Sequence, residues 1–215
     1  MTHTTDRLIA AIAGAAGPIR RLRPPLWRAA LVWLAAIALL AGLVGIRGVR
    51  ADIAEQLANP GVAFGLAMAV LTSLLAAIAA CMLALPDRST RWLLLPLPAV
   101  ALWLGSIGFG CLTAWVSIEP GMVTPYEARQ CLTTALLCGV PISALVIVLM
   151  RRGAPLHRTA ATFAGGLTAA GITAVALTLV HSIDPSVMIL LWNVGIVLVL
   201  IAGQTLAGRR LLGPA

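Results

Sequence analysis

The sequence predicts an all-α fold: a polytopic membrane protein with six transmembrane helices and a short N-terminal cytoplasmic amphipathic helix. Apolar residues occupy 60% of the 215 positions and charged residues only 10%, whereas a soluble domain carries roughly 25% charged residues. The apolar residues form blocks of about twenty, a length that matches the ~30 Å hydrocarbon core at 1.5 Å rise per residue. Strands of a membrane barrel would be about ten residues long and would alternate in polarity, so we expect the blocks to be helices.

Polar and charged stretches divide the chain into an N-terminal segment, 1–25, and a transmembrane domain, 26–210. No carboxylate, Lys or Arg is expected to be buried within the spans of this domain, which disfavours secondary transport because transport pathways usually display intramembrane charge. The six spans are expected at about 26–46, 61–85, 92–116, 131–150, 159–180 and 186–207.

The basic residues predict the orientation of the spans. All fifteen are arginines, and twelve of them fall on the side that holds both termini, against three on the other side (Arg47, Arg50 and Arg129). The positive-inside rule then places both termini in the cytoplasm of a bacterial inner membrane. The net charge of +8 is explained by these orientation signals, and without a soluble domain no direct contact with nucleic acid is expected.

The N-terminal segment predicts an amphipathic helix that starts after a cap at Thr5. Such a helix can dock in the groove of a partner protein, or it can lie on anionic lipid as an anchor. Both readings use the same apolar positions and the same basic positions, which are Leu8, Ile9, Ile12, Arg20, Arg21 and Arg23.

Two of the four cysteines, Cys111 and Cys131, are expected near the outer ends of the third and fourth spans. In an oxidising compartment such thiols meet oxidants and soft metal ions, and a neighbouring pair can close to a disulfide. The alternative is that all four cysteines are small packing residues. The absence of a CxxC motif weakens the case for a thiol–disulfide exchange enzyme.

His181 and Asp184 lie in the short outer turn before the sixth span, at the same expected level as the two outer thiols. They could contribute to a metal site of mixed ligands. Alternatively, Asp184 starts the next helix and satisfies its free backbone donors. The sequence offers no catalytic triad and no cofactor motif, so neither an enzyme nor a resident cofactor is expected.

Several short motifs follow one another in a characteristic order along nearly the whole chain. They are Ile19-Arg-Arg-Leu-Arg-Pro-Pro25, Ala84-Leu-Pro-Asp-Arg-Ser89, Trp92-Leu-Leu-Leu-Pro-Leu-Pro98, Gly108-Phe-Gly-Cys111, Cys131, Arg151-Arg-Gly-Ala-Pro-Leu156, and the stretch from His181 to Trp192. In this order and spacing the chain resembles the NrsF-type negative regulators of extracytoplasmic-function sigma factors. Where that family often has His after the last Trp, this chain has Asn193.

The resemblance implies a membrane-bound anti-sigma factor whose N-terminal segment holds a sigma factor away from RNA polymerase. It also implies that metal or oxidative stress acts through cysteines, with Cys131 at the matching position and Cys111 as the second thiol. Two other functions stay open on the residues alone: a small membrane transport or channel component, and a membrane thiol oxidoreductase.

Overall fold

The computed structural model describes residues 2–15, 23–113, 125–153, 156–180, 195, 198–199 and 201–206. Within these ranges the regular structure is helical, which confirms the predicted all-α class. The elements that have defined bounds are α1 (Thr2–Ala15), α2 (Pro25–Arg47), α3 (Ile53–Ala58), α4 (Pro60–Leu83), the short 3-10 helix η1 (Thr90–Leu94), α5 (Leu97–Thr113), α6 (Pro125–Arg151) and α7 (Arg158–Val180).

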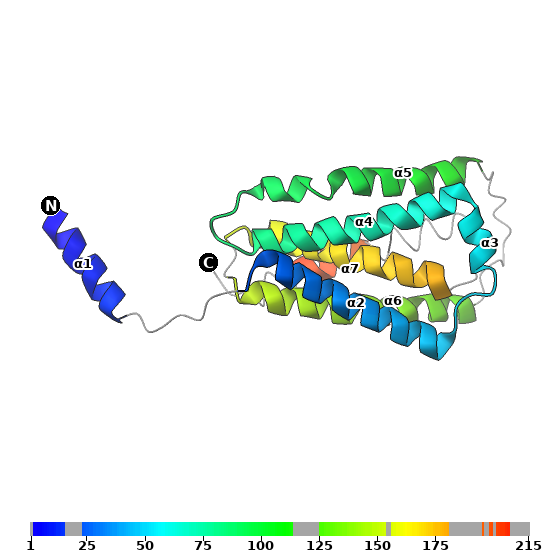
Figure 1. The fold of residues 1–215 in the computed structure, drawn as a ribbon, viewed down its shortest axis with the longest axis horizontal. Coiled ribbons are helices and arrows are strands. Elements are labelled where there is room, and N and C mark those ends of the chain that lie inside the picture. The colour runs from blue at the N-terminus through cyan, green and yellow to red at the C-terminus, as the bar shows by residue number, and fades with distance from the viewer. Residues whose placement is uncertain are drawn as a thin grey trace.

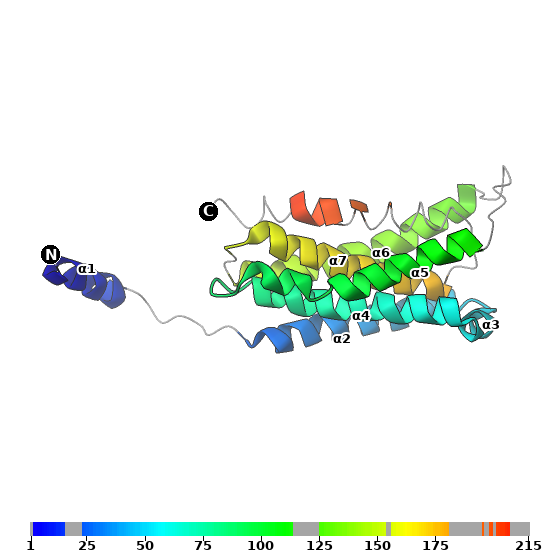
Figure 2. The ribbon, with the colours of Figure 1, turned by 90° about the horizontal axis from the view of Figure 1, so that it is seen from above.

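The long helices form an elongated bundle in which successive helices run in opposite directions (Figure 1). α4 and α7 pack along each other at its centre; α5 covers α4, α6 covers α7, and α2 lies against α4 and α6 (Figure 2). Five stretches of the described chain are long and apolar enough to cross a membrane: Pro25–Arg47, Pro60–Leu83, Thr90–Phe109, Arg129–Arg151 and Arg158–Val180.

The centre of the bundle depends on small side chains. α7 is buried along most of its length and consists largely of Ala, Gly and Thr, residues that let helix backbones approach closely. At Gly171 a Cβ atom would lie only 2.7 Å from Cβ of Ser73 and 2.9 Å from the carbonyl oxygen of Ala69 in α4. The buried hydroxyl of Thr168 donates to the carbonyl of Ala164 at 2.9 Å, so this polar group is satisfied within its own helix.

Proline, glycine and asparagine set the helix ends. α2 and α4 each begin with a proline at the first helical position, where the missing N–H is not needed. The side chain of Asn59 accepts a hydrogen bond from the N–H of Gly61 at 2.9 Å and so caps α4. α2 is followed by Gly48, whose φ of 78° is one that glycine adopts readily.

Some helices differ from the segments expected from hydropathy. The segment expected at 92–116 is not one helix, because η1 ends before Pro96 and α5 begins only at Leu97. Pro96 accounts for the break, since a proline lacks the backbone N–H and its ring obstructs the preceding turn of a helix. α6 begins at Pro125, six residues before the expected start of its span. The polar segment after α2 contains the short helix α3, and Thr5 lies inside α1 rather than at its cap.

The sixth expected span, 186–207, falls mostly outside the described residues. The described positions near its C-terminal end are helical, and two of them lie against α7. Gln204 is buried, and a Cβ atom on Gly166 of α7 would lie 2.7 Å from Cα of Ile201. This stretch therefore packs closely against α7.

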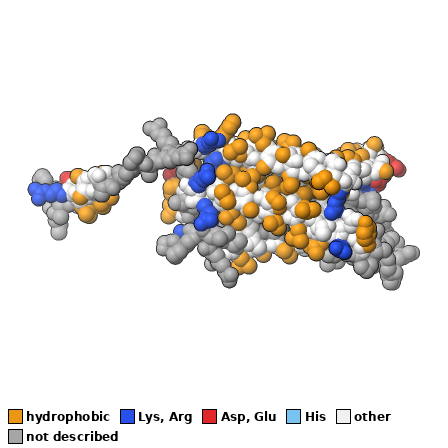
Figure 3. Space-filling view, turned by 90° about the horizontal axis from the view of Figure 1, so that it is seen from below, with side chains coloured by type: hydrophobic (Ala, Val, Ile, Leu, Met, Phe, Trp, Pro, Cys, Tyr) orange, Lys and Arg blue, Asp and Glu red, His pale blue; other side chains and the backbone are white. Residues whose placement is uncertain are grey.

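Basic side chains mark the two ends of the bundle, with an apolar surface between them (Figure 3). We call the end that holds the start of α2 the basic end, and the other the opposite end. Around the basic end the described chain places Arg23, Arg28, Arg88, Arg91, Arg151, Arg152 and Arg158. Around the opposite end it places Arg47, Arg50 and Arg129.

Candidate functional site

α1 stands apart from the bundle in both ribbon views (Figures 1 and 2). Its apolar residues Leu8, Ile9 and Ile12 are 60%, 59% and 63% exposed. Their spacing places them on one side of the helix, so α1 presents an apolar face that no other described element covers. We call α1 and the segment that joins it to α2 the arm. Of its predicted contact residues, Arg23 is exposed, whereas Arg20 and Arg21 lie outside the described residues.

Cys131 lies in the second turn of α6 at the opposite end, where it is only 7% exposed. Its sequence neighbours on α6 are tied to α2 by the guanidinium group of Arg47. That group donates to Oε1 of Gln130 at 2.7 Å, to Oγ1 of Thr134 at 3.0 Å and to Oγ1 of Thr133 at 3.3 Å. The turn around Cys131 is therefore held by a side chain from another helix.

Cys138 lies two turns further along α6, fully buried between Leu43 of α2 and Ala176 of α7. Cys81 is buried in the main core near the end of α4. These environments are those of small packing residues. Cys81, Cys131 and Cys138 are all free thiols.

The other predicted site residues are less fully described. Cys111 lies in the last turn of α5, but its side chain lies outside the described residues, so its role as a second stress-sensing thiol stays a prediction. α5 packs on α4 and η1, whereas α6 packs mainly on α7 and α2. His181 and Asp184 lie outside the described residues. Within the described part of the chain, no group of three or more His, Cys, Asp or Glu side chains is placed to hold a metal ion.

Arg28 is a residue that hydropathy missed. Its side chain is 3% exposed in the first turn of α2, which corrects the expectation that no charged residue is buried within the spans. Its Nη2 donates to the carbonyl oxygen of Leu149 in α6. In a continued helix the N–H of Gly153 would donate to this carbonyl. Here it donates to the carbonyl of Met150 at 2.9 Å instead, so the carbonyl of Leu149 can accept from Arg28.

The signal for Arg28 was present in the sequence. It is a basic residue three positions after the proline that starts α2, and the core cluster contains the adjacent Ala29. Nη1 of Arg28 is buried without a hydrogen-bond partner among the described residues. A guanidinium group in this position interacts favourably with the negative end of the α6 dipole.

An ion pair fixes the loop that follows α2. Arg50 donates from Nε and Nη2 to the carboxylate of Asp52 at 2.7 and 2.5 Å, and its backbone N–H donates to the carbonyl of Leu179 in α7 at 3.1 Å. The hydrogen bond from Arg50 lowers the pKa of Asp52 from 3.8 to about 2. The loop is thereby attached to the end of α7.

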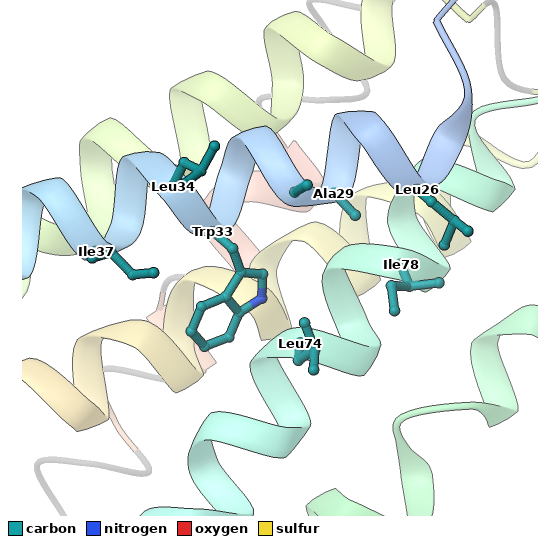
Figure 4. A pocket seen from close by; sticks show the side chains of 8 residues that line it. Leu26, Ala29, Trp33, Leu34, Ile37, Leu74 and Ile78 are labelled. Carbon is teal, nitrogen blue, oxygen red and sulfur yellow. The ribbon is translucent and has the colours of Figure 1, made fainter.

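An apolar groove of about 400 Å³ runs between α2 and α4 on the side of α2 that faces away from α6 (Figure 4). The indole ring of Trp33 extends across it toward Leu74, with Leu34 and Ile37 further along α2. The groove means that the contact between α2 and α4 is incomplete along this stretch.

The chain matches a known protein family. The model of the NrsF family, described as negative regulator of sigma F, matches residues 12–213, which is nearly the whole chain. No curated protein and no solved structure matches the chain significantly.

Proposed function

Since the chain belongs to the NrsF family of negative regulators of sigma F, we propose that it is an anti-sigma factor anchored in the bacterial inner membrane. The arm binds an extracytoplasmic-function sigma factor and keeps it from RNA polymerase. Metal or oxidative stress, sensed around Cys131 near the periplasmic face, releases it.

The observation that carries this proposal is the exposed apolar face of α1. Leu8, Ile9 and Ile12 are each about 60% exposed on a helix that stands away from the bundle (Figure 1). An amphipathic helix with an uncovered apolar face fits the groove of a protein partner. A sigma factor is the partner that the family description implies.

The distribution of arginines supports a cytoplasmic arm. α1 leads into the end of the bundle that carries most of the basic residues (Figure 3), and an excess of Arg marks the cytoplasmic side of membrane proteins. The arm and the sigma factor then share a compartment. Cys131, at the opposite end, then lies near the periplasm, where oxidants and metal ions arrive first.

The experiment that tests the proposal compares two neighbouring positions of α1 in a strain that lacks its own copy of the gene. The complete chain is expected to restore repression of sigma-dependent transcription. Ile9→Asp is expected to fail, because it places a carboxylate on the apolar face. Ala10→Asp adds the same charge to an exposed residue turned by about 100° from Ile9, and it is expected to repress like the wild type.

Membrane levels of the three proteins are measured in parallel. Repression by Ile9→Asp at the wild-type level, with equal protein in the membrane, would remove α1 from the mechanism. Failure of the unaltered chain to repress any sigma factor would remove the proposed function itself.

A further inference from the structure

The structure joins the arm-bearing helix to the thiol-bearing helix at both of their ends. Arg47 at the end of α2 donates to three side chains that flank Cys131 on α6. Arg28 at the start of α2 donates to the carbonyl of Leu149 near the end of α6. The two arginines are nineteen residues apart, which is about 28 Å along a helix.

We propose that Arg47 and Arg28 form a two-ended clamp that couples the turn around Cys131 to the position of α2, and through α2 to the arm. This inference rests on the proposed function and names the residues that transmit the signal. The clamped arrangement is the one that retains the sigma factor, because it is the arrangement in which the thiols described here are free.

The outer contact of the clamp lies in the part of α6 that carries Cys131. Gln130 directly precedes Cys131, and Thr133 and Thr134 occupy the next turn. The hydroxyls of both threonines also donate to the carbonyl oxygen of Gln130, each at 2.9 Å. A ligand or modification that displaces this turn therefore moves all three acceptors of Arg47 together.

The inner contact of the clamp completes the end of α6. Because the N–H of Gly153 turns back to Met150, the carbonyl of Leu149 takes its hydrogen bond from Arg28 on α2. If α2 shifts, a buried guanidinium and a helix-end carbonyl both lose their partner, and each such loss is unfavourable in an apolar environment. The start of α2 therefore has a strong preference for one position relative to α6.

The rest of the packing around α2 permits movement. The fully buried side chains that α2 contributes to the main core are small or medium in size, namely Ala29, Val32 and Ala36. On the α4 side, the groove beside Trp33 leaves contact incomplete (Figure 4). α2 is also the least buried of the helices that lie directly against α6, whereas α7 is buried through most of its length. The arginine contacts therefore add two fixed points to the apolar packing that holds α2.

The test uses the complete chain in phospholipid nanodiscs and compares Arg47→Gln with Arg129→Gln. Arg129 is an exposed arginine at the same end of α6, so its replacement removes the same charge while the three bonds from Arg47 remain. Amide hydrogen exchange is read by mass spectrometry at the far end, in residues 25–30 and 148–153, without any sigma factor. Capture of the purified sigma factor is measured separately.

Arg47→Gln is expected to speed exchange in both far-end segments at least fivefold and to weaken sigma capture by roughly 5- to 150-fold, the usual range of coupling between distant sites. Arg129→Gln is expected to change neither. Faster exchange confined to the outer turns of α2 and α6, with the far end unchanged, would overturn the clamp.

Failure of the clamp and failure of the proposed function give different results in these assays. If the wild-type chain captures no sigma factor, the proposed function fails, and the clamp is judged on hydrogen exchange alone. If the wild-type chain captures the sigma factor and Arg47→Gln captures it equally well with an unchanged far end, the clamp fails and the proposed function stands.

Discussion

The close approach of α7 to α4 makes Gly171→Ala the most quantitative packing prediction. The added Cβ would lie 2.7 Å from Cβ of Ser73 and 2.9 Å from the carbonyl oxygen of Ala69. The second neighbour is backbone, so the two helices must separate. Overpacking of this kind destabilises by about 1–3 kcal/mol, and the better helix propensity of alanine offsets about 0.5–1 kcal/mol of that. The difference is centred on a net loss of about 1 kcal/mol.

Unfolding can be measured through the reactivity of the buried thiols. Cys81, Cys131 and Cys138 are 2%, 7% and 0% exposed, so a thiol-reactive fluorophore reports their exposure as the protein in detergent is heated. At roughly 2–4 °C per kcal/mol for a chain of this size, Gly171→Ala is expected to melt several degrees below the wild type.

Gly105→Ala is the matched control. A Cβ at Gly105 in α5 would meet nothing within 4 Å, so this variant gains helix propensity without a clash and is expected to melt at or above the wild-type temperature. If Gly171→Ala melts as high as Gly105→Ala, the close contact between α7 and α4 does not exist and the reasoning is refuted.

Three further predictions concern the arm, the outer loop and the thiol. Ile12→Ala is expected to weaken sigma binding about 5- to 30-fold in a nanodisc titration, because a partner would bury an isoleucine that is now 63% exposed; unchanged affinity would argue against the apolar face. Asp52→Asn is expected to lower the melting temperature at pH 6, and the difference should shrink from pH 4 to pH 2. The folded-state pKa of about 2 lies below the ordinary 3.8, so the stabilisation is lost as the pH falls through this window; a difference that persists at pH 2 would contradict this. Cys131→Ser is expected to keep basal repression and to blunt induction by oxidant or metal in a transcription reporter; full induction would remove Cys131 from sensing.

Hydropathy predicted the bundle because its signal is summed over about twenty residues at a time. The expected segments 26–46, 61–85 and 159–180 nearly coincide with α2, α4 and α7. The differences between prediction and structure arise at individual residues that a twenty-residue average does not resolve. Pro96 interrupts the third segment, and α6 extends over polar residues from Pro125, since the hydrogen bonds of a helix can continue beyond its apolar part.

The candidate site was only partly accessible to sequence reasoning. The apolar face of α1 was found from helical spacing because it depends on residues close together in the chain. The partners of Arg28 and Arg47 could not be found in that way. Leu149 and Thr134 lie 121 and 87 residues from them in sequence, and only the packing of α2 on α6 brings each pair together. Arg28 falls at the start of the first expected span and was counted as an orientation signal, because hydropathy does not distinguish a buried arginine from an exposed one.

Photo-crosslinking from the arm in living cells tests the central claim most directly. A photoreactive residue replaces Ile9 in the complete chain, and cells are irradiated before and during stress. We expect a crosslink to a sigma factor in unstressed cells that fades when its regulon is induced. The claim is contradicted if repression is intact and yet no sigma factor is crosslinked at this position.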